Sequence, residues 1–130
     1  MLTVAIQQAL KPALGRVYVI ELPDYVKGAG AVHAVYVAPG GDEIIYDARV
    51  QLRTRGDDVL SAEAAAMEAR EAMLDLRYQT VEFDDPRDPV GVTRTYHFLY
   101  IDPIERPTYI PSPTAGYLFS ANYRLFLREV

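Results

Sequence analysis

The feature that most constrains the fold is a change of hydrophobic period in the middle of the chain. Over residues 43–55, apolar and polar side chains alternate, which is the spacing of a β-strand with one buried face. Gly56 ends this alternation, and residues 58–79 repeat their apolar positions about every 3.6 residues, which indicates a helix. The chain therefore turns directly from a strand into a helix. The predicted buried side of the strand is Tyr46, Ala48, Val50 and Leu52, and that of the helix is Ala62, Ala66, Met67, Ala69, Met73 and Leu76.

Apolar patterns elsewhere predict a second helix and further strands. Residues 3–14 are amphipathic, but Pro12 lacks the N–H that a helix interior uses, so we expect this helix to stop near Ala9 or Leu10. Residues 83–91 and 102–116 contain several prolines and are predicted loops. The order helix, strands, helix, strands predicts a single α+β domain whose mixed, mainly antiparallel sheet has its helices packed on one face. The further strands are predicted at residues 16–22, 31–37, 92–101 and 117–127.

Composition places the chain among ordinary soluble domains. Its 130 residues fit one domain, and half of them are hydrophobic. The absence of cysteine from the sequence excludes disulfides, thiolate metal sites and cysteine nucleophiles. A formal net charge of −5 disfavours a protein that binds nucleic acid by neutralising phosphates. The sequence contains neither an apolar run long enough to cross a membrane nor an N-terminal signal pattern, so we expect no membrane partner.

Few residues suggest catalysis. The two histidines, His33 and His97, lie inside predicted strands and away from any serine nucleophile motif, so we interpret them as structural or exposed strand positions. Asp84, Asp85 and Asp88 cluster in a predicted loop but lack the spacing and the glycine of a calcium loop. The sequence also has no glycine-rich phosphate-binding motif. We therefore predict a protein that is not an enzyme and that uses no metal or cofactor.

The stretch RTRGDD, residues 53–58, allows three interpretations. It could be an adhesive Arg-Gly-Asp tripeptide, part of a basic strand that touches nucleic acid, or the corner where the strand turns into the helix. Regular structure is predicted on both sides of it, which favours the corner. Asp57, Asp58 and Ser61 can accept hydrogen bonds from the free N–H groups at the start of the helix, and the two acids also complement its dipole.

Candidate interface residues lie on the polar side of the central strand and in two loops. Arg49, Arg53 and Arg55 form a cationic ridge that could contact nucleic acid or pair with acids of a neighbouring strand or subunit. Aromatic rings for base stacking are not interleaved on that face, which favours the pairing with acids. Long loops usually carry contacts, so residues 23–30 and 103–116 are predicted to reach neighbouring subunits. These loops and the closing strand add Asp24, Tyr25, Lys27, Glu105, Arg106, Tyr109 and Arg124 to the candidates.

Three stretches, taken together, resemble the tail-terminator proteins of long-tailed bacteriophages, a family also described as minor capsid or tail-completion proteins. The first stretch is YDARVQLRTRGDDVLSAEAAAMEAREAMLDL, a strand, a polar turn and a helix rich in Ala and Glu. The second is ERPTYIP, which resembles a proline-bearing loop ahead of the family's last strand, and the third is GYLFSANYRLFL, which is similar to that strand. The order and spacing of these stretches carry the resemblance. Residues 110–116 depart from the turn that is usual in the family.

The resemblance implies a structural virion protein that acts by assembly, without catalysis or cofactor. Such proteins form a ring, commonly a hexamer, on the last ring of the tail tube. The ring stops tube polymerisation and offers its other surface to the head connector. The implied partners are further copies of the chain, the tail-tube protein and a connector or neck protein, with DNA only as the genome that passes through the lumen. We thus expect a location at the head-proximal end of the virion tail, after assembly in the host cytoplasm.

Two alternatives stay open at this point. One is another neck, head-completion or tail-tube-related protein of the same virion, since these also use small α+β domains in rings. The other, from a different class, is a nucleic-acid-binding or small regulatory domain that uses the arginine ridge. An acidic lumen would repel DNA phosphate, which is compatible with the negative net charge and with a conduit.

Overall fold

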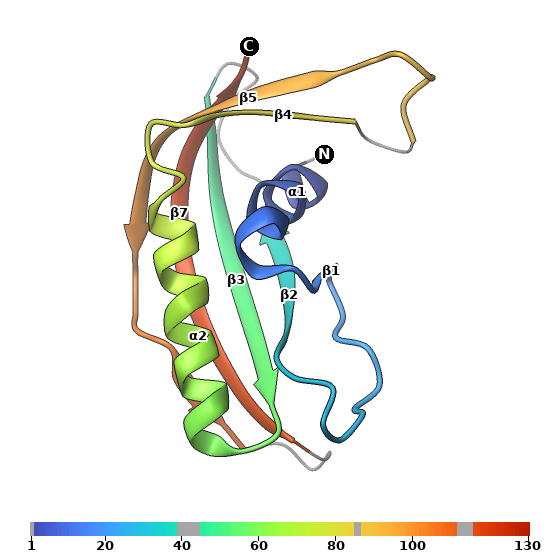
Figure 1. Cartoon of the computed structure of the whole chain (residues 1–130). Helices are drawn as coiled ribbons and strands as arrows, with labels where there is room; N and C mark the ends of the chain where they lie inside the picture. Colours follow the sequence, from blue (N-terminus) through green and yellow to red (C-terminus); the bar gives the residue numbers. More distant parts are fainter. Residues whose placement is uncertain (1, 39–44, 85–86, 112–115) are drawn as a thin grey trace.

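The computed structural model describes residues 2–38, 45–84, 87–111 and 116–130. These residues form one α+β domain in which two helices pack on a curled, mostly antiparallel sheet, as the sequence predicts (Figure 1). The helices are α1 (Leu2–Leu14) and α2 (Val59–Leu74). The strands are β1 (Val17–Val19), β2 (Val32–Ala38), β3 (Tyr46–Gly56), β4 (Thr80–Phe83), β5 (Arg94–Pro103), β6 (Thr108–Ile110) and β7 (Tyr117–Glu129).

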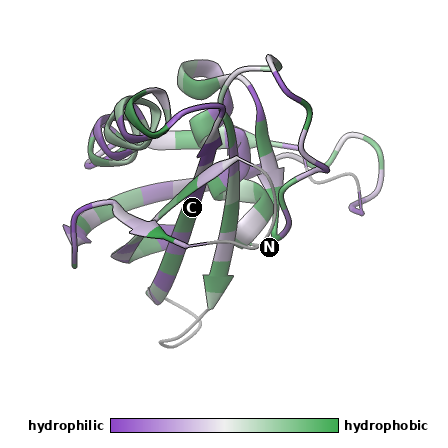
Figure 2. Ribbon diagram, turned by 90° about the horizontal axis from the view of Figure 1, so that it is seen from below, coloured by the Kyte–Doolittle hydropathy of each residue, from purple (hydrophilic) through white to green (hydrophobic). Residues whose placement is uncertain are grey.

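The sheet is organised around β3 and β7. Its strand order is β1-β2-β3-β7-β5-β4, and β6 pairs with the start of β7, which β5 leaves uncovered. β1 runs parallel to β2, and the other described pairs are antiparallel. All eleven residues of β3 have a partner in β7, from Tyr46 opposite Leu127 to Gly56 opposite Tyr117. Both helices lie on one side of this sheet, so its other side carries no helix (Figures 1 and 2).

The core lies between the helices and the sheet and follows the predicted alternation. In β3, Ala48, Val50 and Leu52 are buried, whereas Arg49 and Arg53 on the other side are exposed. The same alternation runs along β7, and the helices contribute their apolar faces. The buried residues of β7 that face the helices are Phe119, Ala121, Tyr123, Leu125 and Leu127.

α2 packs closely on β3 because its buried face consists mainly of alanines. Its buried residues are Ala62, Ala65, Ala66, Ala69 and Met73. A Cβ atom placed on Gly56 would lie 2.9 Å from the Ala62 Cα, so only glycine fits where the strand meets the helix. The sequence-based placement of Met67 in this stripe is wrong, because Met67 lies on the far side of α2 with 37% of its surface exposed, and Ala65 takes its place.

The prediction that α1 ends near Ala9 or Leu10 is also wrong, because the helix continues through Pro12 to Leu14. Pro12 is exposed and lies in the last turn, so its missing N–H removes one helical hydrogen bond near the end of the helix. Buried Ile6 and Leu10 anchor the helix on the core, and Leu14 packs against the same cluster. Tertiary packing therefore outweighs the local preference of proline here.

Two short strands, β4 and β6, are not predicted from the sequence, and α2, β1 and β5 differ in their bounds. α2 ends at Leu74, and β4 follows after a turn in which Tyr78 has a φ of 64°. β4 is too short to show an alternating pattern, and β6, in the predicted loop 102–116, has all three residues exposed and is defined by its pairing with β7. β1 is shorter than residues 16–22 because Ile20, with a φ of 70°, turns the chain away from the strand. β5 is displaced by two residues from 92–101.

The two histidines lie in strands, as expected, and each contacts a threonine. His33 in β2 is 3% exposed, and its Nδ1 lies 2.8 Å from the Thr54 Oγ1 of β3. His97 in β5 is only partly buried, and its Nδ1 lies 2.9 Å from the Thr80 Oγ1. Burial lowers the pKa of His33 from 6.5 to about 4, so this ring is neutral inside the fold near neutral pH.

We expect the protein to lose stability as the pH falls from 6.5 towards about 4, because protons bind His33 in the unfolded chain before they bind it in the folded one. The loss is complete only below the folded pKa and amounts to about 3 kcal/mol. Urea unfolding at a series of pH values measures it. The His33→Gln variant is expected to flatten the slope in this window. Equal slopes for wild type and His33→Gln would contradict the assignment.

We expect Gly56→Ala to destabilise the fold by about 1–3 kcal/mol, because the added methyl group overlaps Ala62 and the helix has to move away from β3. Thermal unfolding followed by circular dichroism measures the change. Gly28→Ala is the matched control, since its Cβ would meet nothing within 4 Å and only its φ of 79° resists the substitution. A Gly56→Ala variant that melts with wild type would show that the approach of α2 to β3 is not tight.

Candidate interaction surface

The side of the sheet without a helix is the first candidate surface, and we call it the open face. Residues paired across an antiparallel ladder point to the same side, so the register assigns its members. Arg49 of β3 is opposite Arg124 of β7, and Gln51 lies between Tyr36 of β2 and Asn122 of β7. The open face consists of Tyr36, Asp47, Arg49, Gln51, Arg53, Tyr100, Asp102, Asn122, Arg124 and Phe126.

Arg49 and Arg53 are its two exposed cations. The Arg53 Nε donates a hydrogen bond of 3.2 Å to the Gln51 Oε1. Within the part of the chain that the structure describes, neither arginine forms an ion pair with an acid. Arg49 stands opposite Arg124 across the ladder, and its charge also helps to lower the pKa of the Asp47 carboxyl that pairs with Arg124. This part of the open face is therefore ready to accept an anionic group.

Arg124, in contrast, has its counter-charge inside the molecule. Its Nε and Nη2 donate to the two oxygens of Asp47 at 2.9 and 2.6 Å, and its guanidinium lies 4.8 Å from the centre of the Phe126 ring. This pair of hydrogen bonds holds the pKa of the Asp47 carboxyl below its usual value. Arg124 thus serves mainly to tie β7 to β3.

The arginine ridge predicted from the sequence is divided in the structure. Arg55 is half-buried: its Nη2 donates to the Pro23 carbonyl at 2.7 Å, and its guanidinium lies 5.5 Å from the centre of the Tyr25 ring. The Tyr25 hydroxyl in turn donates to the Asp57 carboxylate at 2.7 Å, and the Gly28 N–H donates to the same oxygen at 3.0 Å. Arg55 therefore holds the loop 23–30 against the end of β3, away from the exposed pair.

These contacts also define the corner between β3 and α2. Asp58 is the N-cap of α2, since its carboxylate accepts from the Ser61 N–H at 2.9 Å and from the Ser61 hydroxyl at 2.8 Å. Asp57 instead accepts from the loop, so the expectation that it caps the helix is wrong. The arginine and the aspartate of the Arg-Gly-Asp tripeptide both bond to the loop 23–30, and the tripeptide is a structural corner.

The remaining predicted residues fall into two groups. Asp24 and Lys27 are exposed on the loop 23–30, beside the corner. Arg106 is exposed before β6, and Tyr109 of β6 packs against Phe119 with ring centres 5.7 Å apart. Glu105 lies apart from the loop 23–30 and from β6. Its carboxylate accepts a hydrogen bond of 2.5 Å from the Asn122 amide at the open face. The structure thus brings Arg49, Arg53, Glu105 and Arg124 to one face and Asp24, Tyr25, Lys27 and Arg55 to the end of β3.

A cavity of about 440 Å³ lies on the open face beside Arg49. Tyr36, Gln51 and Asn122 line its polar side, and Ile104 lies on the segment that follows β5. Sequence patterns did not identify these residues because they come together only through the register of β2, β3 and β7. A tyrosine, amides and an arginine suit the recognition of a polar protein surface.

The acids of the predicted loop form local contacts. Asp88 accepts two hydrogen bonds from Arg94, at 2.6 and 3.0 Å, and Asp84 accepts one from the Thr93 hydroxyl at 2.9 Å. Asp85 lies outside the described residues. Among the residues that are described, no group of three or more His, Cys, Asp or Glu side chains is arranged to hold a metal ion.

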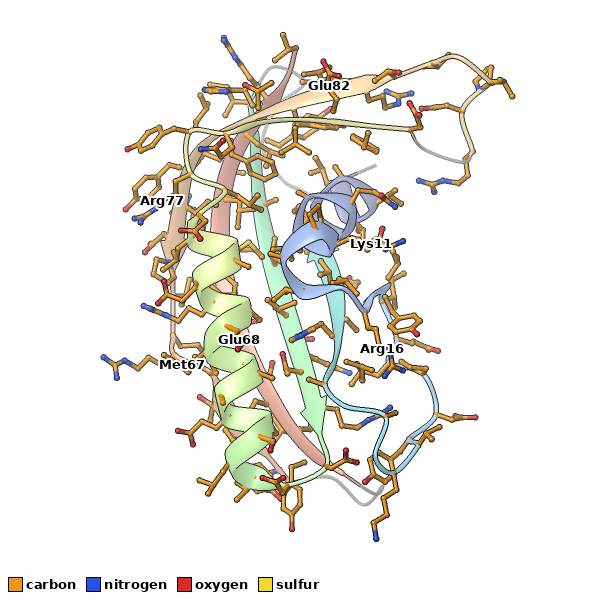
Figure 3. All side chains as sticks on the ribbon, in the orientation of Figure 1. Lys11, Arg16, Met67, Glu68, Arg77 and Glu82 are labelled. Carbon is orange, nitrogen blue, oxygen red and sulfur yellow. The ribbon has the colours of Figure 1, made fainter. Side chains whose placement is uncertain are left out.

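The far side of α2 is the second candidate surface, and we call it the acidic helix face. Leu60, Ala64 and Met67 repeat at helical spacing along it, with exposed fractions of 77% for Leu60 and 37% for Met67. Acids follow towards the C-terminal end of the helix, where the helix dipole is also negative. Met67 and Glu68 are labelled on α2 in Figure 3. The acidic helix face consists of Leu60, Ala64, Met67, Glu68, Glu71 and Asp75.

Comparison with known proteins adds no relative: no protein-family model matches the sequence, and no curated protein matches it. Among the described helices, none combines the length and the apolar character that a membrane span needs.

We expect Tyr25→Phe to loosen the loop 23–30, because the variant loses the hydrogen bond to Asp57, although Arg16, Arg55 and the Gly28–Asp57 contact still hold the loop. Limited trypsin digestion reports this as faster cleavage after the exposed Lys27, by several-fold. Tyr18→Phe is the matched control, since Tyr18 is partly exposed on β1, outside the loop. Unchanged cleavage in Tyr25→Phe would show that the Tyr25–Asp57 contact does not hold the loop.

Proposed function

We propose that this chain is a ring-forming structural protein of a bacteriophage tail and acts as its terminator. The proposal starts from the three stretches that resemble tail terminators. In the structure they correspond to β3, the corner and α2; to β6 with the residues on either side of it; and to β7. The chain separates these stretches, but the fold joins them.

The observation that carries the proposal is that these stretches form one contiguous block. β7 pairs with β3 along the whole of β3 and with β6 at its start, while α2 packs across β3 and β7. A resemblance in order and spacing therefore corresponds to a three-dimensional unit. This supports a common fold for the stretches better than scattered short matches would.

The surfaces of the block support an assembly role. The open face offers two exposed arginines without an acidic partner in the described chain, and it also offers exposed Tyr36 and Tyr100. Aromatic and arginine side chains are enriched where proteins bind one another. The acidic helix face, on the opposite side, differs in both charge and shape.

A terminator of this kind acts by binding the end of the tail tube. A ring of subunits binds the surface on which the next tube ring would assemble, and its outward side differs from that surface, so polymerisation stops. Two unlike faces on one chain suit such a ring, because a contact between unlike faces is repeated from subunit to subunit around the ring. The outward side then binds the connector. The net charge of −5 disfavours retention of the DNA that passes through.

We expect the purified protein to form closed rings, commonly hexamers, and to cap one end of assembled tail tubes. Negative-stain electron microscopy measures the symmetry, and tube length measured with and without the protein reports termination. Tubes assembled in its presence should be shorter and bear a single ring at one end. A protein that stays monomeric at high concentration and ignores tube ends would contradict the proposal. A ring that repeats along the tube would instead identify a tube subunit.

A further inference from the structure

We infer that the open face of one copy docks on the acidic helix face of the next copy. This inference rests on the proposed function, because it names the contact that would build the ring. The occupant of the open face is therefore a second copy of this chain.

Charge is the first argument. Arg49 and Arg53 project from the open face without an acidic partner in the described chain, whereas Arg124 is paired with Asp47. On the acidic helix face, Glu68, Glu71 and Asp75 are exposed together near the negative end of the helix dipole. The only nearby cations on α2 or just after it are Arg70, which is half-buried, and Arg77, whose Nε donates to the Leu74 carbonyl at 3.0 Å.

Apolar surface is the second argument. Leu60, Ala64 and Met67 form an exposed stripe on a helix that needs no further burial for its own fold. Tyr36 and Tyr100 are about half exposed on the open face, and Ile104 borders its cavity. Both surfaces thus combine an apolar part with charges of opposite sign, as the core and rim of a protein interface do.

The third argument comes from the layers. The open face and the acidic helix face lie on opposite sides of a two-layer molecule, so each copy offers one to each neighbour (Figure 1). The same contact can therefore repeat in one direction, which yields a ring or a filament but not a closed dimer.

The outer edge of the sheet at β1 offers a weaker route for association. The Gln7 side-chain amide donates to the Val17 carbonyl at 2.9 Å, and the Glu21 N–H donates to the Val19 carbonyl at 2.9 Å. These two contacts occupy carbonyls that a strand from another copy would need. The β1 edge is thereby protected against strand addition.

Charge reversal on each surface tests the inference. The first variant is Arg49→Glu with Arg53→Glu, and the second is Glu68→Arg with Glu71→Arg. Either variant alone places like charges across the proposed contact, so self-association should weaken on the order of a hundredfold. The two variants mixed in equal amounts, or all four substitutions in one chain, restore opposite charges and should restore assembly. Sedimentation velocity measures the assembly state, and circular dichroism checks that each variant folds.

Lys11→Glu with Glu21→Arg is the matched control, because both side chains are exposed away from the two surfaces. It should assemble like wild type. If wild type forms rings and either reversed variant does so equally well, the inference is overturned while the proposed function stands. If only the open-face variant is impaired, the partner of that face is something other than α2. Loss of assembly in both variants without rescue by mixing would also overturn the inference.

A separate outcome concerns wild type. If it stays monomeric and fails to cap tail tubes, the proposed function fails, whatever the variants do. If wild type instead shifts short duplex DNA at low salt and the open-face variant does not, the two arginines bind phosphate, and the inference is overturned in favour of a nucleic-acid surface.

Discussion

The pairing of β3 with β7 is the interaction on which the rest of the structure depends. Each strand has buried residues on one side and polar residues on the other. The strands can therefore pair only in a register that places both buried sides on the same face of the sheet. A slip of one residue would place Arg49 and Arg53 under α2 and would expose Val50 to water. Burying two unpaired guanidinium groups is far more costly than any gain from an alternative ladder. The register, and with it the composition of the open face, is therefore fixed by the core.

The corner at Gly56 also fixes how α2 is oriented on the sheet. Because α2 starts immediately after β3, and because its alanines bring it close to the sheet, the helix can turn only one side towards the core. That side ends with Met73, and all longer or charged side chains of the helix are forced to the sides or outward. The acidic helix face thus results from the close packing of α2 on the sheet. Asp57 and Arg55 then tie the loop 23–30 to the same corner.

Periodicity predicted the elements that bury many side chains and failed for those defined by backbone pairing. β3, α2 and β7 are long, and their alternation or helical spacing is visible in the sequence. β6 buries none of its residues, so it exists only because β7 offers free backbone groups beside it. Arg55 looked like a surface cation because the loop that covers it comes from 32 residues earlier in the chain. The cavity beside Arg49 required the strand register, which local patterns do not contain.

A two-layer domain leaves one side of its sheet without a partner, and this chain covers that side with charge instead of a third layer. Exposed guanidinium groups are hydrated in a separate copy. The same groups become favourable contacts when an acidic surface of the same chain arrives. Because the sheet is twisted and curled, the open face of one copy and the helix layer of the next are not parallel planes. Each repeat of the inferred contact therefore adds a rotation, which closes into a ring where the rotations sum to a full turn and extends into a helical filament where they do not.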